Sequence, residues 1–274
     1  MRLSLLPVGY MRARSLSLAV LLLATTACLD PLALPVGRFG TISVAAYANG
    51  GSSYVIRPEA AFYDQSDLAY VPVVGDTCVV ALYNPTTAVN PGLQTLNAGD
   101  FLFTRIGGRI DSMQALPNIS LRFYTLVNPL GIPYTPGDTL SVTIPGAVDG
   151  FPATAISIRT AEAFTHGAIG VPAENLDLPV VWTAAPSAGS QMTFSLRYAT
   201  GVSSGAANEQ IFCSFTDDGS ATIRAGYLDA WRLALDVTRS TRALRVRGRE
   251  IMVDSRTRLS IISTFGQPLS SIGF

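Results

Sequence analysis

The sequence is a succession of short runs in which apolar and polar residues alternate, and turn-forming residues separate the runs. Alternation with a period of two places successive side chains on opposite faces of a strand. From Phe39 onward the turns recur about every 8–12 residues, a spacing typical of β-sandwiches. Asn49-Gly50-Gly51 lies between two such runs and predicts a hairpin. One short helix is expected at residues 225–232, and the remaining pattern predicts an all-β protein.

The alternating runs fall into two groups. Residues 165–175, THGAIGVPAEN, are small, rich in Gly and Pro, and aperiodic. We therefore expect two tandem β-sandwich domains, at residues 39–168 and 169–274. Residues 178–199, LPVVWTAAPSAGSQMTFSLRYA, place a tryptophan before a Pro-bearing loop and an alternating strand. This stretch is similar to the early strands of fibronectin-type-III-like domains, and the resemblance implies an immunoglobulin-like sandwich. We expect Trp182 to be buried between the sheets.

The first residues form a separate segment. An apolar run at residues 16–24 is broken only by Ser17, and it is too short for a membrane span, which needs about 20 apolar residues. Arginines precede this run, and the small residues Thr25, Thr26 and Ala27 follow it. A basic region, a short apolar core and small residues before a cleavage site are typical of a secretory signal peptide. Of the two candidate start residues, Met11 gives the more compact signal and is favoured over Met1.

Cys28 follows the small residues directly. The segment resembles a bacterial lipoprotein signal, although Thr25 stands where that family most often has Leu. The resemblance implies a signal peptide at residues 1–27, lipidation of Cys28 and a membrane anchor in the cell envelope. Residues 29–38, LDPLALPVGR, contain two prolines and no periodicity, so we expect residues 28–38 to form the lipidated N-terminus and a tether. Leu29, rather than Asp, after the cysteine favours the outer membrane. The alternative is ordinary secretion, with Cys28 as a free or bridged thiol.

Lipidation of Cys28 would leave two further cysteines. Cys78 and Cys213 form an even pair and are a candidate disulfide between the two halves of the chain. Both also lie in apolar strand-like runs, where an unpaired cysteine is often simply buried. Because a bridge requires Cα atoms within about 7 Å, both alternatives stay open.

The charged residues argue against nucleic acid as a partner. All 19 basic residues are arginines, and removal of the signal peptide leaves slightly more acids than bases. No basic excess remains for a phosphate backbone.

Three arginines nevertheless alternate along one strand-like run. Arg245, Arg247 and Arg249 share one face and are a candidate face for an anionic ligand. The favoured alternative is a solvated sheet face whose arginines pair with nearby acids, a pattern that also opposes edge-to-edge aggregation; those acids are Asp236, Glu250 and Asp254. The apolar positions change phase after Gly248, which predicts a bulge or tight turn there.

Motifs for catalysis or metal binding are weak. Gly201–Gly205 fits G-x-S-x-G, but it lies in a Gly/Ser loop, and the sole histidine, His166, precedes it, so a flexible loop is favoured. No Cys or His lies near His166 in sequence, so we expect a solvent-facing side chain and no metal site or cofactor. Residues 217–220, DDGS, lack the spacing of a calcium loop and predict a hairpin turn.

These observations favour a non-catalytic binding or structural module at the cell envelope, with a glycan or protein of the envelope as candidate partner. The alternative is a carbohydrate-active or other hydrolase. That alternative requires two carboxylates about 5–10 Å apart in one cleft.

Overall fold

The computed structural model describes residues 37–48, 54–64, 75–83, 95–116, 123–200 and 207–267. The expected signal peptide, Cys28 and the Gly201–Gly205 motif lie outside these described residues. Residues 36–274 form one compact unit.

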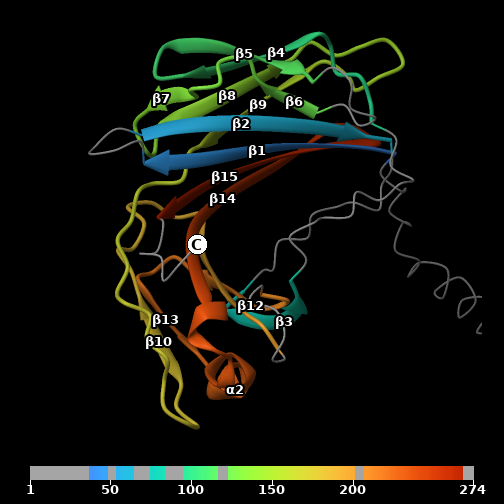
Figure 1. Ribbon diagram of the computed structural model, residues 1–274. Helices are drawn as coiled ribbons and strands as arrows, with labels where there is room; N and C mark the ends of the chain where they lie inside the picture. Colours follow the sequence, from blue (N-terminus) through green and yellow to red (C-terminus); the bar gives the residue numbers. More distant parts are fainter. Residues whose placement is uncertain are drawn as a thin grey trace, which may run out of the picture. The chain divides into compact units, whose positions relative to one another are not determined.

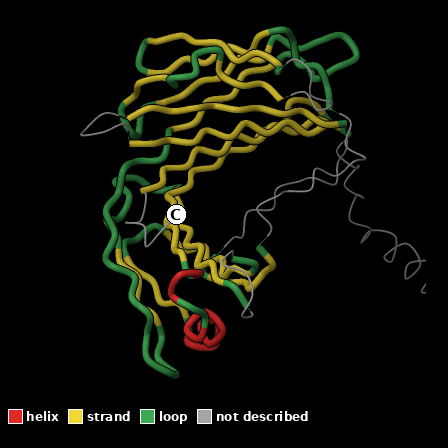
Figure 2. The backbone as a smooth tube through the Cα atoms, in the orientation of Figure 1, coloured by secondary structure: helices red, strands yellow, loops and turns green. Residues whose placement is uncertain are grey.

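The described chain consists mainly of strands, so the all-β prediction is confirmed (Figures 1 and 2). The strands are β1 (Arg38–Ala48), β2 (Tyr54–Tyr63), β3 (Thr77–Leu82), β4 (Phe101–Ile106), β5 (Arg109–Ala115), β6 (Phe123–Leu126), β7 (Ile132–Tyr134), β8 (Thr139–Ile144), β9 (Thr154–Arg159), β10 (Leu178–Val181), β11 (Ser190–Tyr198), β12 (Glu209–Thr216), β13 (Ser220–Ile223), β14 (Ser240–Asp254) and β15 (Thr257–Gln267).

The predicted short helix is also present. It is α2 (Ala225–Leu233), which buries Leu228 and Trp231 and is followed by the 3-10 turn η1 (Asp236–Thr238). No helix in the described ranges has the length and apolar character needed to cross a bilayer.

One large sheet organises the fold. Its strand order is β3-β12-β11-β14-β15-β1-β2-β6-β5-β4-β8-β9, with β7 also paired to β2, while β10 and β13 form a separate two-stranded ribbon. The sheet folds back so that β9 packs against β14 and β15, which gives a sandwich-like pair of layers. The ribbon lies beside the lower part of the sheet, below the point where β14 curves away from the layers (Figure 1).

Local patterning accounts for the pairing of β1 with β2. Their antiparallel register matches Ala46 to Ile56, so the predicted hairpin is confirmed, although its turn lies outside the described residues. Alternate side chains of β1, at Ile42, Val44 and Ala46, are buried. A strand with one apolar face is stable only when that face meets a core, and here it does.

The expected boundary between residues 168 and 169 is not confirmed. Strands from both sides of it share the large sheet, because β3 pairs with β12 and β1 pairs in parallel with β15. The segment at residues 165–175 does lack regular strands, as expected, but the chain on either side of it belongs to the same compact unit.

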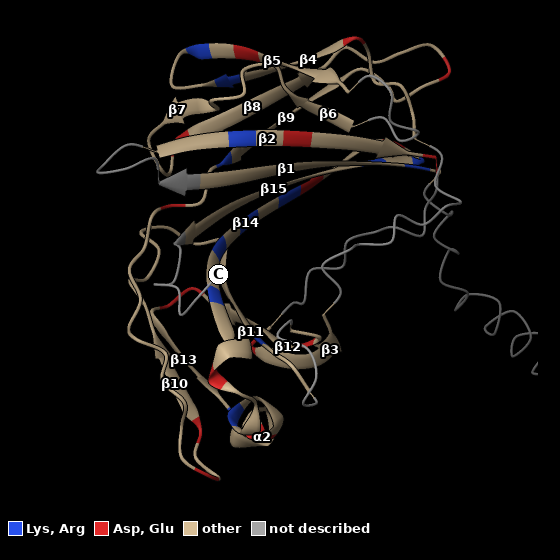
Figure 3. Ribbon diagram, viewed as in Figure 1, with Lys and Arg blue, Asp and Glu red and all other residues tan. Residues whose placement is uncertain are grey.

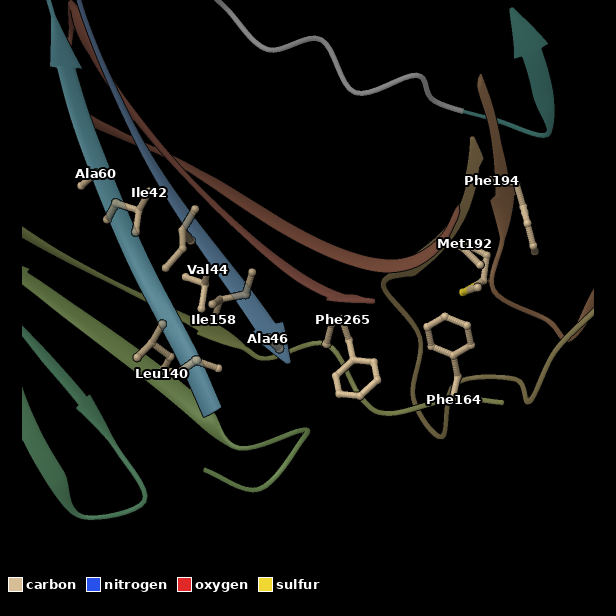
Figure 4. Close-up of a cluster of buried hydrophobic side chains, with 14 of the residues drawn as sticks. Ile42, Val44, Ala46, Ala60, Leu140, Ile158, Phe164, Met192, Phe194 and Phe265 are labelled. Carbon is tan, nitrogen blue, oxygen red and sulfur yellow. The ribbon is translucent and has the colours of Figure 1, made fainter. Parts of the chain in front are cut away.

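The buried apolar side chains form a continuous cluster through this unit. Figure 4 shows Ile42 and Leu140 at one end, Met192 and Phe194 at the other, and Phe164 with Phe265 between them. The expected burial of Trp182 is confirmed, since the side chain is 7% exposed. Its ring centroid lies 5.5 Å from that of Phe194 in β11.

Candidate binding site

The arginine row of β14 points into the protein. Figure 3 marks the basic residues along the strand, and the exposed fraction of Arg245 is 0% and that of Arg247 is 6%. Odd-numbered side chains of β14 face the core, and even-numbered ones, such as Val246, face outward and are only half-buried. Buried guanidinium groups require paired charges and hydrogen bonds to offset their lost hydration.

Asp217 supplies the charge for Arg245. The Nε of Arg245 donates to Asp217 Oδ2 over 2.7 Å, and its Nη2 donates to Oδ1 over 3.1 Å. Asp217 also accepts from Trp182 Nε1 at 2.8 Å and from Ser190 Oγ at 2.7 Å. The Arg245 guanidinium further donates to backbone carbonyl oxygens, including that of Thr183. The carboxylate and the guanidinium are therefore both saturated by protein groups.

Glu162 does the same for Arg247. Nε and Nη2 of Arg247 donate to the two oxygens of Glu162, each over 2.9 Å, in a bidentate pair. The carbonyl oxygens of Ser187 and Ala188 accept from the same guanidinium. Arg159 adds a second ion pair to Glu162 at 3.3 Å. Bidentate geometry fixes the direction of the arginine as well as its charge balance.

These placements differ from both sequence expectations. Arg245 and Arg247 do not form an exposed face for an anionic ligand, because buried carboxylates already hold them. They also do not pair with Asp236, Glu250 or Asp254; these acids pair with or bond to Arg239, Arg258 and the turn at residues 256–257.

Arg249 alone of the three is exposed, and its Nη1 donates to the carbonyl oxygen of Ser157 over 2.8 Å. The partners Asp217 and Glu162 were missed because nothing near them in sequence marks them.

Two local predictions were wrong. Gly248 forms no bulge, since it pairs in register with Ile262, and the irregularity lies between Met252 and Asp254. The apparent change of phase arises because the core-facing positions hold arginines up to residue 249 and apolar residues from Ile251 onward. Asp217–Ser220 is not a hairpin turn either. β12 pairs with β11 and β3, whereas β13 pairs with β10.

A disulfide joins Cys78 to Cys213. The two cysteines lie directly opposite each other in the β3–β12 pair, and both are buried. The bond holds β3, the strand at one end of the sheet order, to its neighbour β12.

The outward side of the sheet contains a hollow of about 410 Å³. It is formed by the face of β11, β12, β14 and β15 that is opposite the core-facing side chains Met192 and Phe194. We call it the outer hollow. Its uncharged polar lining residues are Ser190, Gln191, Thr193, Ser214, Thr216 and Ser260. The hydroxyl of Ser190 is directed to the core side, where it donates to Asp217, and the other five side chains are on the outward side.

The other described lining residues are apolar, charged or glycine. Phe212, Val246 and Ile262 supply apolar surface, and Glu250 supplies a carboxylate. Arg249 also lines the hollow, but it is an odd-numbered residue of β14 and its guanidinium bonds to Ser157 on the core-facing side. Glu250 forms an ion pair with Arg258 at 3.5 Å. Cavities of this size, mostly apolar with a few placed polar groups, are typical of small-molecule sites.

Two of the polar lining side chains bond to each other. Ser214 Oγ donates to Gln191 Oε1 over 3.4 Å, which orients the amide. The Nε2 group of Gln191 has no hydrogen-bond partner among the described residues. It is therefore available to a ligand in the outer hollow.

His166 lies away from the outer hollow. It is half-buried, its Nδ1 lies 2.7 Å from the carbonyl oxygen of Gly167, and its backbone forms a bridge with Trp182. In the described part of the chain, no group of three or more His, Cys, Asp or Glu side chains is arranged to hold a metal ion.

No protein-family model matches the chain, and neither curated proteins nor solved structures yield a match.

Proposed function

We propose that this protein is a lipid-anchored binding module of the bacterial cell envelope, and that its ligand occupies the outer hollow. The observation that carries the binding function is the hollow itself, in which five outward-facing uncharged polar side chains line a volume of about 410 Å³. The anchor rests on the signal-like segment that ends at Cys28.

The charge content of the outer hollow favours binding over hydrolysis. Glycoside hydrolysis generally needs two carboxylates about 5–10 Å apart, one as acid and one as base or nucleophile. Glu250 is the single acid among the described lining residues, and Arg258 partners it. The buried acids Asp217 and Glu162 lie on the other face and are held by arginines. No observation on the described residues favours the hydrolase alternative.

Ion pairs and a disulfide fix the strands around the hollow from the core-facing side of the sheet. The Arg245–Asp217 and Arg247–Glu162 pairs fix the core side of β14, and the disulfide ties β12 to β3. A binding site loses less conformational entropy when its walls are already fixed. The ion pairs and the disulfide therefore have a structural role: they hold the strands that form the walls of the site.

A ligand screen with a blocked variant tests this function. Gly248 lines the hollow, and a Cβ built on it meets no atom within 4 Å, so Gly248→Leu would place a side chain in the space that a ligand needs. Thermal unfolding of the full-length protein is measured with neutral disaccharides, acidic disaccharides and neutral tetrapeptides. A ligand that binds the folded state raises the melting temperature, and the rise grows with the logarithm of ligand concentration once that concentration exceeds Kd.

We expect one class to stabilise the wild type and to lose that effect in Gly248→Leu. A ligand panel in which no class shifts the wild type, or in which every shift survives Gly248→Leu, contradicts a binding function of the outer hollow.

A further inference from the structure

The chemistry of the outer hollow identifies a class of ligand. Serine and threonine hydroxyls both donate and accept hydrogen bonds, and a glutamine amide does so through separate atoms. Thr193, Ser214 and Gln191 lie side by side across β11 and β12, where Thr193 pairs in register with Ser214 and Gln191 with Thr216. Thr193 Oγ1 donates to the carbonyl oxygen of Leu244 and Ser214 Oγ donates to Gln191 Oε1, so these two hydroxyls remain acceptors while Gln191 Nε2 remains a donor. Sugar hydroxyls both donate and accept, so a row of such groups suits a polyhydroxylated ligand.

The balance of charge disfavours an ion as ligand. Glu250 is already paired with Arg258, and the guanidinium of Arg249, an odd-numbered residue of β14, is directed to the core-facing side, where it donates to Ser157. An anionic or cationic group would enter a site that offers it no unbalanced countercharge, and desolvation of that group would remain uncompensated. A neutral ligand avoids this cost.

Apolar side chains complete the match. Phe212 is half-buried and lines the hollow together with Val246 and Ile262. An aromatic face takes up apolar C–H surface, and the ring of a saccharide presents such surface between its hydroxyls. A purely hydrogen-bonding ligand would leave this wall unused.

Gly248 leaves the space that a ligand needs. It lies within the long strand β14, where glycine lowers stability because it adds backbone entropy and no packing. Neither a left-handed backbone nor close packing explains it, since a Cβ there meets nothing within 4 Å. A glycine in a strand often marks a point where a ligand approaches the backbone closely.

We propose that the outer hollow binds a neutral saccharide unit, with its ring against Phe212 and its hydroxyls on Gln191, Thr193 and Ser214. This inference rests on the proposed binding function and names its ligand class.

Isothermal titration calorimetry tests the inference directly. The full-length protein is purified in a detergent without a sugar headgroup, because such a headgroup would compete for the site. Cellobiose, maltose and N,N′-diacetylchitobiose are titrated as neutral probes, with digalacturonic acid and a neutral tetrapeptide as the other classes. We expect saturable binding of at least one neutral disaccharide and no saturable binding of the acid or the peptide.

Three variants locate the site. Gly248→Leu should lose measurable binding because its side chain projects into the hollow, and Gln191→Leu should weaken binding because it removes the free amide donor. Gly170→Leu is the matched control, since a Cβ at this glycine also meets nothing within 4 Å and the residue does not line the hollow. Should Gly248→Leu unfold early, Gln191→Leu alone decides the outcome.

The outcomes separate the two proposals. Neutral disaccharides that fail to bind, or that bind Gly248→Leu and Gln191→Leu as well as the wild type, overturn the saccharide inference. If digalacturonic acid or the tetrapeptide binds instead and Gly248→Leu abolishes it, the saccharide inference is wrong and the binding function stands. If no probe of any class binds, both proposals fail.

Discussion

Arg245 and Asp217 form an ion pair of 2.7 Å in which both side chains are almost completely removed from solvent. The pair connects the middle of β14 to the residue that follows β12. Trp182 and Ser190 donate to the same carboxylate, so one acid links four separate parts of the sequence. Its burial is the reason that the arginine row of β14 does not form an anion-binding surface.

Removal of one partner of this pair should destabilise the protein strongly. Arg245→Met leaves the Asp217 carboxylate buried without its countercharge, and loss of one partner from a buried pair costs about 3–5 kcal/mol. Urea unfolding of the variant measures the cost. The double variant Arg245→Met/Asp217→Leu should recover much of the loss, because no unpaired charge remains.

The half-exposed pair of Glu250 and Arg258 is the matched control. Glu250→Gln should change the free energy of unfolding by about 0–1 kcal/mol, as is usual for solvent-exposed pairs. Equal costs for Arg245→Met and Glu250→Gln would contradict the structural role given to burial.

The disulfide should contribute measurably to stability. Cys78 and Cys213 are separated by 135 residues, and a bond that closes so long a loop restricts the unfolded chain. Replacement of both by serine should cost about 2–5 kcal/mol. Urea unfolding with and without a reductant measures this, and the reductant should affect the wild type alone. Unchanged stability in the double variant would rule out a structural contribution from the bond.

Trp182 provides a test of the core. Trp182→Ala should cost about 3–5 kcal/mol, the usual range for truncation of a buried aromatic side chain. Trp182→Phe keeps much of the packing against Phe194 and removes the donor to Asp217. It should therefore lower the free energy of unfolding by about 1–3 kcal/mol. Chemical denaturation monitored by circular dichroism compares the two. A larger loss for the phenylalanine variant would contradict this assignment of the indole.

Alkaline pH should weaken the fold through Tyr198. The pKa of this phenol is raised from 10.0 to about 12. Burial is the larger cause, and the 2.8 Å hydrogen bond to Glu209 is the second. The folded state therefore keeps the proton that the unfolded chain loses. The contribution of Tyr198 is full below pH 10 and is lost as the pH rises towards 12.

Tyr198→Phe removes this dependence. Its free energy of unfolding should fall less steeply than that of the wild type when urea titrations are repeated above pH 10. If the free energy of unfolding falls equally steeply above pH 10 in both proteins, a group other than Tyr198 causes the loss of stability at alkaline pH.

The proposed anchor has its own test. Cys28→Ser removes the acceptor for the lipid, so the protein should move from the membrane fraction to the soluble fraction of disrupted cells. Immunoblots of the two fractions report the result. A Cys28→Ser protein that fractionates like the wild type contradicts lipidation at this residue.

The sequence predicted the features that depend on neighbouring residues. Strand alternation, the β1–β2 hairpin and the short helix α2 follow from local periodicity and turn chemistry, and the structure contains all three. The inward direction of the arginines on β14 could not be predicted from local sequence. Their partners are distant in sequence: Asp217 is 28 residues from Arg245, and Glu162 is 85 residues from Arg247. An outward arginine and a buried, paired arginine give the same alternating pattern.

The candidate site was not predictable for a related reason. The outer hollow gathers Gln191, Phe212, Gly248 and Ile262 from four strands, and its existence depends on their register. Each of these residues is ordinary in its own strand. The large sheet itself was missed because β1 pairs with β15 across almost the whole sequence, a contact that no local pattern encodes.

That parallel pairing also has a consequence for the order of synthesis. β1 leaves the ribosome among the earliest strands of the sheet and β15 among the last, so one side of β1 stays unpaired until the final strand has been made. Unpaired strand edges recruit foreign strands, and contacts between distant residues form slowly. A nascent chain of this kind needs protection until translation is complete, and a nonsense mutation that removes only the last strand should cause misassembly far from the site of the truncation.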